Sequence, residues 1–186
     1  MDQSKLIKLI ENSFDSIERS EISLRQFVLT DKYGMSREIT DKEWGEAGFD
    51  RIDQEWKEIP DSEIEECDCQ LAHMQAPEFT YFLPAYMRYS VRNHKRPIWE
   101  TDIIGSTVFS LYPSQKDMDS FWYNKKQLSL ISEIQKNTII KFLEFVEMNA
   151  EDVQKPDART ALDRYWLDEE ALNKKFKMDG LQPPFN

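Results

Sequence analysis

The chain has 186 residues, which fits one domain of ordinary size, and 40% of them are hydrophobic, with 11 Phe and five Trp available for a core. Only five residues are glycine, fewer than β-rich and phosphate-cradling folds use in their turns, so the composition favours helices. The net charge of −11 and the pI near 4.7 oppose nonspecific binding to nucleic acid or anionic lipid and favour a basic protein partner.

The first predicted helix is amphipathic and begins at a cap formed by Asp2 or Ser4. Its apolar face repeats at helical spacing through Leu6, Ile7, Ile10, Phe14 and Ile17. A second helix is predicted over 22–34. The stretch 39–60 contains two glycines and ends at Pro60, so we expect it to be broken helix.

An acidic segment is followed by an aromatic and then a basic one. A helix is predicted over 61–74, with Asp61 or Ser62 as its cap and Pro77 as its end. In 78–96 one broad apolar face is predicted, made of Phe79, Phe82, Leu83, Tyr86, Met87, Ser90 and Val91. Pro84 predicts a kink near 80–84, or else a helix that begins at this proline.

The second half of the chain contains the clearest helix signal. Residues 98–116 mix β-branched and aromatic residues and are expected to be extended or irregular. Ser132 and Gln135 form a capping box, which predicts a central helix after Ser132. A last helix is predicted from about 157, before a tail at 181–186. The predicted fold is an all-α single domain over 1–180, with a kinked central helix and irregular connections.

The sequence also bears on cellular location. The longest stretch without a formal charge, 103–115, has 13 residues, fewer than the roughly 18 to 20 that a spanning helix needs, so no membrane partner is expected. The N-terminal residues lack the apolar run of a secretory signal. Cys67 and Cys69 are too close for an ordinary loop-closing disulfide. These features favour the cytoplasm.

No motif indicates a cofactor or a catalytic centre. On a helix only Cys69 and His73 share a face, Cys67 points elsewhere, and the other histidine is His94, so no metal site is predicted. The dinucleotide, P-loop, hydrolase and zinc-protease signatures do not occur. We therefore predict no cofactor and favour a non-enzymatic protein.

The basic stripe formed by Arg88, Arg92, Lys95 and Arg96 has two interpretations. In the first, the basic end of a buried helix pairs with the acidic helix before it and complements its own dipole. In the second, the stripe is a pole that binds an anion or a partner. We expect Arg88 to pair with a partly buried carboxylate and Arg96 to face solvent.

Three sequence blocks resemble a family of uncharacterised bacterial proteins of about this length and of unknown function. The first block is a W-x-x-I-P segment at Trp56, Ile59 and Pro60. The second is a Y-x-L-P-A-x-M-R block at Tyr81, Leu83, Pro84, Ala85, Met87 and Arg88, and the third is a late helix with Phe142 and Leu143. The resemblance implies a bacterial, cytoplasmic, single-domain protein and implies no activity, cofactor or catalytic residue.

The leading functional hypothesis is an acidic binding protein of the inhibitor or immunity type, with a basic protein partner and with Trp44 and Trp56 as interface anchors. The alternative is a small enzyme or ligand-binding protein whose anion pocket gathers Tyr81, Arg88, Arg92 and His94. A structural or self-associating module is the third hypothesis.

Overall fold

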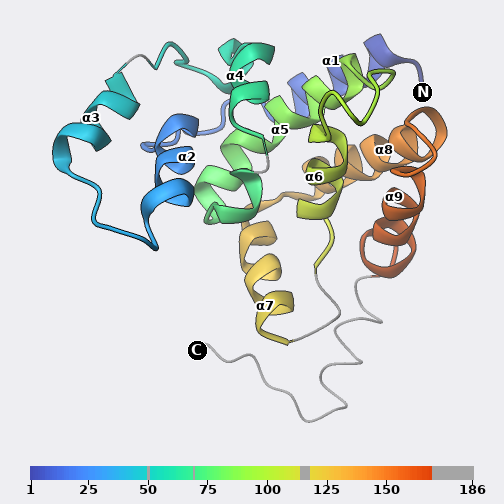
Figure 1. Ribbon diagram of the computed structural model, residues 1–186. Helices are drawn as coiled ribbons and strands as arrows, with labels where there is room; N and C mark the ends of the chain where they lie inside the picture. Colours follow the sequence, from blue (N-terminus) through green and yellow to red (C-terminus); the bar gives the residue numbers. More distant parts are fainter. Residues whose placement is uncertain (50, 69, 114–117, 169–186) are drawn as a thin grey trace.

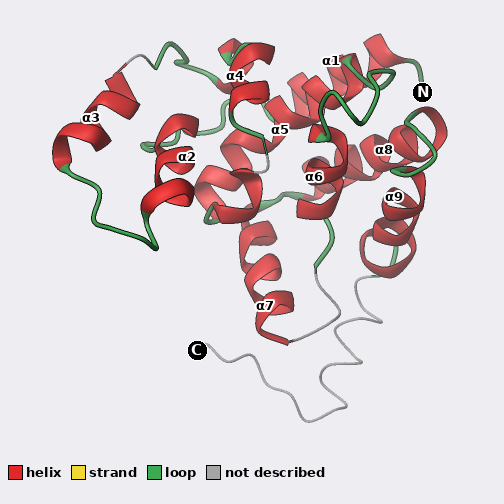
Figure 2. Cartoon of the chain, in the orientation of Figure 1, coloured by secondary structure: helices red, strands yellow, loops and turns green. Residues whose placement is uncertain are grey.

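The computed structural model describes residues 1–49, 51–68, 70–113 and 118–168 (Figure 1). Over these residues the chain is helical and contains no strand, which confirms the predicted all-α fold (Figure 2). The helices are α1 (Gln3–Ser13), α2 (Leu24–Tyr33), α3 (Asp41–Phe49), α4 (Asp61–Glu66), α5 (Ala76–Arg92), α6 (Ile103–Ser110), α7 (Met118–Gln127), α8 (Glu133–Asn149) and α9 (Lys155–Ala161). Shorter turns are η1 (Trp56–Glu58), η2 (Gln70–His73), η3 (Leu128–Leu130) and the π-helical η4 (Leu162–Trp166).

Helix α5 lies at the centre, and α1, α4, α6, α7 and α8 pack around it. Fourteen of its 17 residues are buried, so side-chain packing outweighs the hydrogen bond that Pro84 cannot donate. The helix begins at Ala76 and continues through Pro84, so the alternative in which it begins at that proline is wrong. Pro77, expected to end the preceding helix, lies instead in the first turn of α5.

The helices with clear capping signals form as predicted. The Asp2 side chain caps α1 by accepting from the backbone N–H groups of Ser4 and Lys5. Ser132 and Gln135 form both hydrogen bonds of the capping box at the start of α8. Leu6 and Ile10 on α1 and Phe142 on α8 have no exposed surface, which anchors both helices to the core.

The helix predicted over 61–74 is wrong in its second half, because α4 ends at Glu66. Two side chains from elsewhere in the fold bind the carbonyls that follow it. The Tyr86 hydroxyl donates to the carbonyl of Cys67, and Gln127 Nε2 donates to the carbonyls of Leu71 (3.1 Å) and Met74 (2.7 Å). Tertiary hydrogen bonds thus replace the continued helix in this segment.

The prediction of extended or irregular structure over 98–116 is also wrong, because α6 occupies its middle. Asp102 caps this helix and accepts from the N–H of Gly105 over 3.1 Å. Ile103 and Val108 are fully buried, so packing offsets the low helix propensity of β-branched residues. The end of the segment, at 114–116, lies outside the described residues.

The predicted last helix begins slightly earlier than expected and changes its winding. Helix α9 begins at Lys155, and the chain then forms the π-helical turn η4. The part of the prediction beyond Asp168, like the tail at 181–186, lies outside the described residues.

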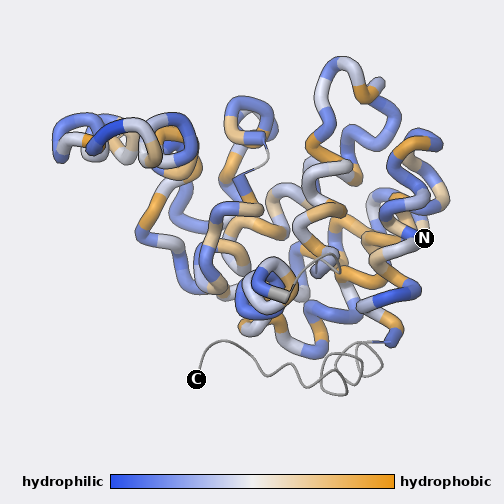
Figure 3. Tube along the Cα trace, turned by 60° about the horizontal axis from the view of Figure 1, so that its bottom comes forward, coloured by the Kyte–Doolittle hydropathy of each residue, from blue (hydrophilic) through white to orange (hydrophobic). Residues whose placement is uncertain are grey.

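Hydrophobic residues gather in the body of the molecule, whereas hydrophilic ones prevail along α3 at the edge (Figure 3). Helix α3 packs against α2 and stands away from the central helices (Figure 1). In the part of the chain that the structure describes, no helix combines the length and the apolar character required to cross a membrane.

Candidate functional site

A buried polar cluster of Arg51, Asp53 and Tyr81 joins the loop before η1 to α5. Arg51 donates Nε (2.8 Å) and Nη2 (2.7 Å) to the Asp53 carboxylate, and the Tyr81 hydroxyl donates to the same carboxylate over 2.6 Å. Burial tends to raise the pKa of Asp53, but hydrogen bonds from Arg51 and Tyr81 outweigh it and lower the pKa. The three side chains are hydrogen-bonded to one another, so the cluster holds the loop before η1 against α5. Tyr81, which was predicted to bind a ligand, is part of this structural cluster.

Arg88 is only 4% exposed and joins α5 to the segment that contains η1. It donates Nη1 to the carbonyl of Lys57 (2.6 Å) and Nη2 to the carbonyl of Ile59 (2.7 Å), and its guanidinium lies 5.4 Å from the Trp56 ring centroid. Burial lowers the pKa of Arg88. The prediction that Arg88 pairs with a carboxylate is wrong, because its guanidinium donates to backbone carbonyls instead. The W-x-x-I-P and Y-x-L-P-A-x-M-R segments are therefore in direct contact.

The basic end of α5 pairs with α4 and with the residues that follow α5. Arg92 binds Asp61 over 3.2 Å, and Arg96 binds both Glu65 and Glu100, the latter over 3.3 Å. Arg96, which was expected to face solvent, has a side chain that is 34% exposed and is paired with these two carboxylates. The hydrogen bond with Glu65 raises the pKa of this guanidinium. Internal pairing accounts for both arginines.

The structure does not gather Tyr81, Arg88, Arg92 and His94 into one pocket within the described residues. The His94 ring packs edge-on against Phe145 with centroids 5.1 Å apart, and its Nδ1 lies 2.9 Å from the carbonyl of Val91. The hydrogen-bond and ring partners of the four predicted ligands differ, and only Arg88 and Arg92 lie close enough for the charges of Arg92 and Asp61 to shift the pKa of Arg88.

The two tryptophans predicted as interface anchors differ in exposure. Trp56 is 2% exposed and donates its indole N–H to the carbonyl of Phe14 over 2.7 Å, so its assignment to the surface is wrong. Trp44 is 36% exposed and lies on α3. Only Trp44 is placed where a partner can reach it.

Helix α3 and its flanking residues carry exposed apolar side chains, which we call the α3 patch. None of the described side chains of α3 is buried. The patch comprises Met35 (103% exposed), Trp44 (36%), Phe49 (85%) and Ile52 (63%). Exposed large apolar side chains in one segment of the chain are candidates for contact with a partner protein. Sequence reasoning identified Trp44 alone, because the alternation of charged and apolar residues in this stretch resembles an ordinary amphipathic face.

Polar contacts hold α3 against α2. The Ser23 hydroxyl donates to the carbonyl of Ala47, and Gln26 Nε2 donates to the carbonyl of Trp44, each over 3.1 Å. Before the helix, Arg37 binds Glu43 through both guanidinium Nη groups, at 2.7 and 3.0 Å, and lowers the pKa of Glu43 to about 2. Hydrogen bonds and an ion pair, rather than the burial of an apolar face, hold α3 in place.

The members of the α3 patch other than Met35 lie in an acidic stretch of the chain. Residues 38–58 carry eight acidic and three basic side chains, and one of the three bases, Arg51, is bound to Asp53 in the interior. Among the residues of the stretch that the structure describes, the exposed acids are Glu38, Asp41, Glu46, Glu55 and Glu58. A partner that covers the patch therefore meets a negative surface.

Two hollows occur on other faces of the molecule, and the six predicted binding residues line neither. One, of about 460 Å³, lies between η2, α6 and α9 and is lined by His73, Asp68, Asp102 and Asp157. The other, of about 340 Å³, lies between η3, α8 and η4. Among the described residues, no group of three or more His, Cys, Asp or Glu side chains is arranged to hold a metal ion.

Cys67 is a free thiol with 1% exposure, and burial raises its pKa to about 12. A thiol that stays protonated is a poor nucleophile, so Cys67 packs as a small apolar side chain. Cys69 lies outside the described residues.

A search of curated proteins and a search of solved structures gave no match to the chain. The model of one family of unknown function, DUF6714, matches residues 2–170. This match covers nearly the whole chain and confirms the resemblance to a family without an assigned function. The chain belongs to the family of unknown function DUF6714.

Proposed function

We propose that this protein is a non-enzymatic binding protein that docks on a basic protein partner through the α3 patch, in the manner of an inhibitor or immunity protein. One observation carries the proposal. A nine-residue helix with no buried described side chain presents large apolar groups to solvent within an acidic stretch of chain.

The energetics support a docking role for α3. Helices shorter than about 12 residues are marginal in water, and burial of an apolar face normally stabilises them. Phe49 at the end of this helix and Ile52 beyond it are instead exposed, and each would contribute about 2 kcal/mol if a partner buried it fully. A partner therefore gains affinity from the same side chains that leave the free helix weakly packed.

The negative charge around the α3 patch favours a partner with a positively charged surface. The eight acids and three bases of 38–58 attract a positive surface and repel nucleic acid and anionic lipid. Aromatic and aliphatic anchors within a charged rim are the arrangement typical of protein interfaces. A basic protein satisfies both requirements.

The proposal is tested by capturing partners on the immobilised protein, purifying the retained protein and measuring its affinity by calorimetry. The double variant Phe49→Ser/Ile52→Ser should bind at least about 30-fold more weakly than the wild type, which corresponds to about 2 kcal/mol. The matched control is Trp99→Ser/Phe109→Ser, which removes two apolar side chains that are 80% and 70% exposed and lie outside the patch. The control should bind like the wild type.

Two further measurements separate the proposal from its competitors. The affinity for a basic partner should fall as NaCl rises from about 50 to 300 mM, because the rim charges become screened. An acidic partner, or an affinity that Phe49→Ser/Ile52→Ser leaves unchanged, contradicts the proposal. Sedimentation that shows a wild-type dimer and a monomeric double variant would assign the patch to self-association instead.

A further inference from the structure

The side chain of Gln26, at the start of α2, is hydrogen-bonded at both ends of its amide. Its Oε1 accepts from the backbone N–H of Ser23 over 2.8 Å, which completes the capping box of α2. Its Nε2 donates to the carbonyl of Trp44 on α3 over 3.1 Å. Gln26 is 7% exposed, so water competes little for either hydrogen bond. One amide therefore joins the first turn of α2 to the backbone of α3.

The Ser23 hydroxyl holds a second point of α3. It accepts from the backbone N–H of Gln26 over 3.2 Å and donates to the carbonyl of Ala47 over 3.1 Å. Because α3 ends at Phe49, the Ala47 carbonyl has no partner within the helix, and Ser23 supplies one. Trp44 and Ala47 are at positions i and i+3, so their carbonyls lie on the same side of the helix. We call these contacts from Ser23 and Gln26 the α2–α3 latch.

Gly48 leaves the space that the Gln26 amide occupies. A methyl group added at this glycine would lie 3.0 Å from Nε2 and 3.2 Å from Cδ of Gln26. Non-bonded heavy atoms prefer separations of about 3.5 to 4.0 Å, so the added group would push the amide away. The amide cannot retreat without lengthening one of its two hydrogen bonds. Close approach of the two helices thus explains a glycine that otherwise weakens α3.

The latch acts on the helix that carries part of the α3 patch. None of the described side chains of α3 is buried, so little apolar packing fixes the rotation of this helix about its axis. Trp44 and Phe49 of the patch lie on α3 and turn with it. A surface whose orientation is fixed before binding loses less conformational entropy when a partner docks. The latch therefore bears on the affinity of the patch without contacting the partner.

We propose that Gln26 is the positioning residue of the α3 patch, because its amide sets the orientation in which α3 presents Trp44 and Phe49 to a basic partner. This inference rests on the function proposed above and concerns the same surface. Gln26 acts through the backbone of α3, since its own side chain is nearly inaccessible.

The variant Gln26→Glu separates the latch from the capping box. Glutamate keeps an acceptor for the N–H of Ser23 and is itself a capping-box residue, but it has no N–H to donate to the Trp44 carbonyl. Hydrogen exchange of the full chain, measured without a partner, should quicken at least about fivefold in α3, which corresponds to about 1 kcal/mol. Exchange in α5 should stay unchanged. Unaltered exchange in α3 overturns the proposal.

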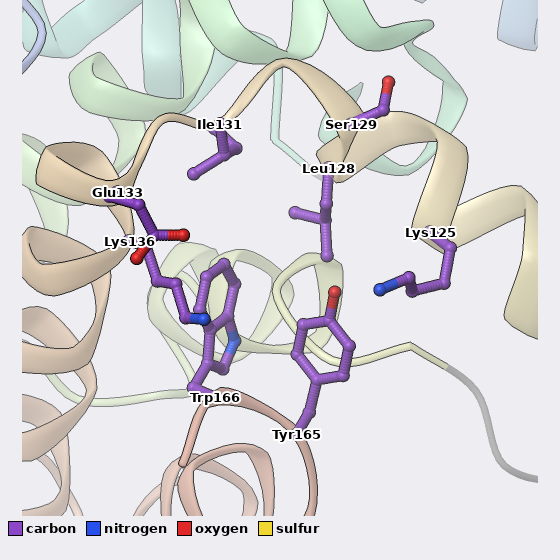
Figure 4. Close-up of a pocket in the computed structure, with 8 residues that line it drawn as sticks. All are labelled: Lys125, Leu128, Ser129, Ile131, Glu133, Lys136, Tyr165 and Trp166. Atoms are coloured by element: carbon purple, nitrogen blue, oxygen red, sulfur yellow. The ribbon is translucent and has the colours of Figure 1, made fainter. Parts of the chain in front are cut away.

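The matched control is Gln135→Glu, in the capping box of α8. Gln135 is 8% exposed, so both variants place a carboxylate at a similarly buried position of the same motif. The first turn of α8 lines the hollow of about 340 Å³ through Glu133 and Lys136 (Figure 4). Among the described residues, the Gln135 amide nitrogen donates to no second helix. The control should leave exchange in α3 unchanged, and an equal effect of both variants would contradict the latch.

A second pair of variants tests the geometry by the sign of its effect. Gly48→Ala should quicken exchange in α3, because the added methyl group displaces the Gln26 amide, although alanine by itself favours a helix. In the Gln26→Ala background the methyl group has room, so the same substitution should slow exchange in α3. Slower exchange in both backgrounds would overturn the role assigned to Gln26.

Binding is measured with a defined probe, a synthetic peptide of lysine and leucine residues that forms a basic amphipathic helix. Gly48→Ala, which changes no charge, should bind this peptide about threefold more weakly than the wild type. Quicker exchange in α3 with unchanged peptide affinity would make Gln26 a structural residue only and contradict the positioning role. Peptide binding that Phe49→Ser/Ile52→Ser leaves unchanged counts against the proposed function instead, and the exchange results still decide whether the latch exists.

Discussion

Helices α5 and α3 show opposite relations between sequence and packing. Helix α5 contains an internal proline and yet runs unbroken for 17 residues, because 14 of them are buried. Helix α3 has nine residues, includes Gly45 and Gly48, and buries none of its described side chains. The comparison shows that burial fixes the centre of this fold, whereas a few polar contacts hold its edge. At this edge Phe49 stays 85% exposed.

The largest expected effect comes from the centre, at the Arg51–Asp53 pair. Asp53→Asn removes the negative charge that neutralises a buried guanidinium, so it should lower the free energy of unfolding by about 3 to 5 kcal/mol. Urea unfolding followed by circular dichroism measures this. The control is Asp61→Asn, whose partner Arg92 is half-exposed and which should cost at most about 1 kcal/mol. Equal losses in the two variants would contradict the structural role of the cluster.

The pH dependence of the same variant tests the sign of the effect. The pKa of Asp53 is lowered by folding, so its contribution is present above the ordinary carboxyl pKa of about 4 and is lost as the pH falls below it. The stabilities of the wild type and Asp53→Asn should therefore converge between about pH 4 and pH 2. A difference that stays constant over this range would argue against an ionised Asp53.

A smaller effect is expected where α5 meets the segment after η1. Arg88→Gln removes two charge-assisted hydrogen bonds to buried carbonyls and should cost about 1 to 3 kcal/mol. Because its partners are neutral carbonyls, the loss should differ little between low and high salt. Arg92→Gln, which breaks an exposed ion pair, should cost less than about 1 kcal/mol and only at low salt. A salt-dependent loss for Arg88→Gln would indicate a carboxylate partner.

The edge of the molecule can be loosened without disturbing its centre. Gln26→Ala removes the hydrogen bond to the Trp44 carbonyl and half of the α2 capping box, and should cost about 1 kcal/mol. Hydrogen exchange should quicken in α3 and stay unchanged in α5. Gln54→Ala, at an exposed position, should change neither rate. Faster exchange in α5 would mean that the two helices open together.

The smallest effect has the opposite sign. Glu63 is half-buried on α4, and burial raises its pKa, although the charge of Arg25 opposes the shift. A raised carboxyl pKa means that folding favours the protonated form, so stability is lost as the pH rises through the folded pKa. Glu63→Gln should therefore gain up to about 0.5 kcal/mol at pH 7 and nothing at pH 3, measured by thermal unfolding. A loss of stability at pH 7 would show that the carboxylate is a net favourable contact.

Local signals in the sequence predicted part of the fold. Residues close together in the sequence form the caps at Asp2 and Ser132 and the apolar face of 78–96. The helices that these local signals predicted are present in the structure. The predicted helix over 61–74 ends early because Tyr86 and Gln127 bind backbone carbonyls of this segment. The helix at 103–110 forms because its side chains are buried against other elements. The local periodicity of a sequence gives no information on either kind of tertiary contact. No prediction was made for α7.

The candidate sites were harder to predict because their decisive partners are backbone groups or distant residues. Arg88 donates to two backbone carbonyls. Every residue has a backbone carbonyl, so the sequence does not indicate which of them accepts a hydrogen bond. Trp56 is surrounded by charged neighbours in the chain and yet lies in the core, because the Phe14 carbonyl and Arg88 cover it. Gln26 and Trp44 are 18 positions apart and meet only in the folded chain.

Gly45 of α3 bears on the free-energy cost of association with a partner. A methyl group added at Gly45 meets no atom within 4 Å, so no packing constraint explains this glycine, and it weakens the helix. A partner that docks on α3 therefore also restricts a segment that is loosely held beforehand. Calorimetry of the complex should show an unfavourable entropy and a heat-capacity decrease larger than a rigid patch of the same area would give. An alanine at Gly45 should reduce this ordering cost and slow dissociation, which links one small residue at the edge to the lifetime of the complex.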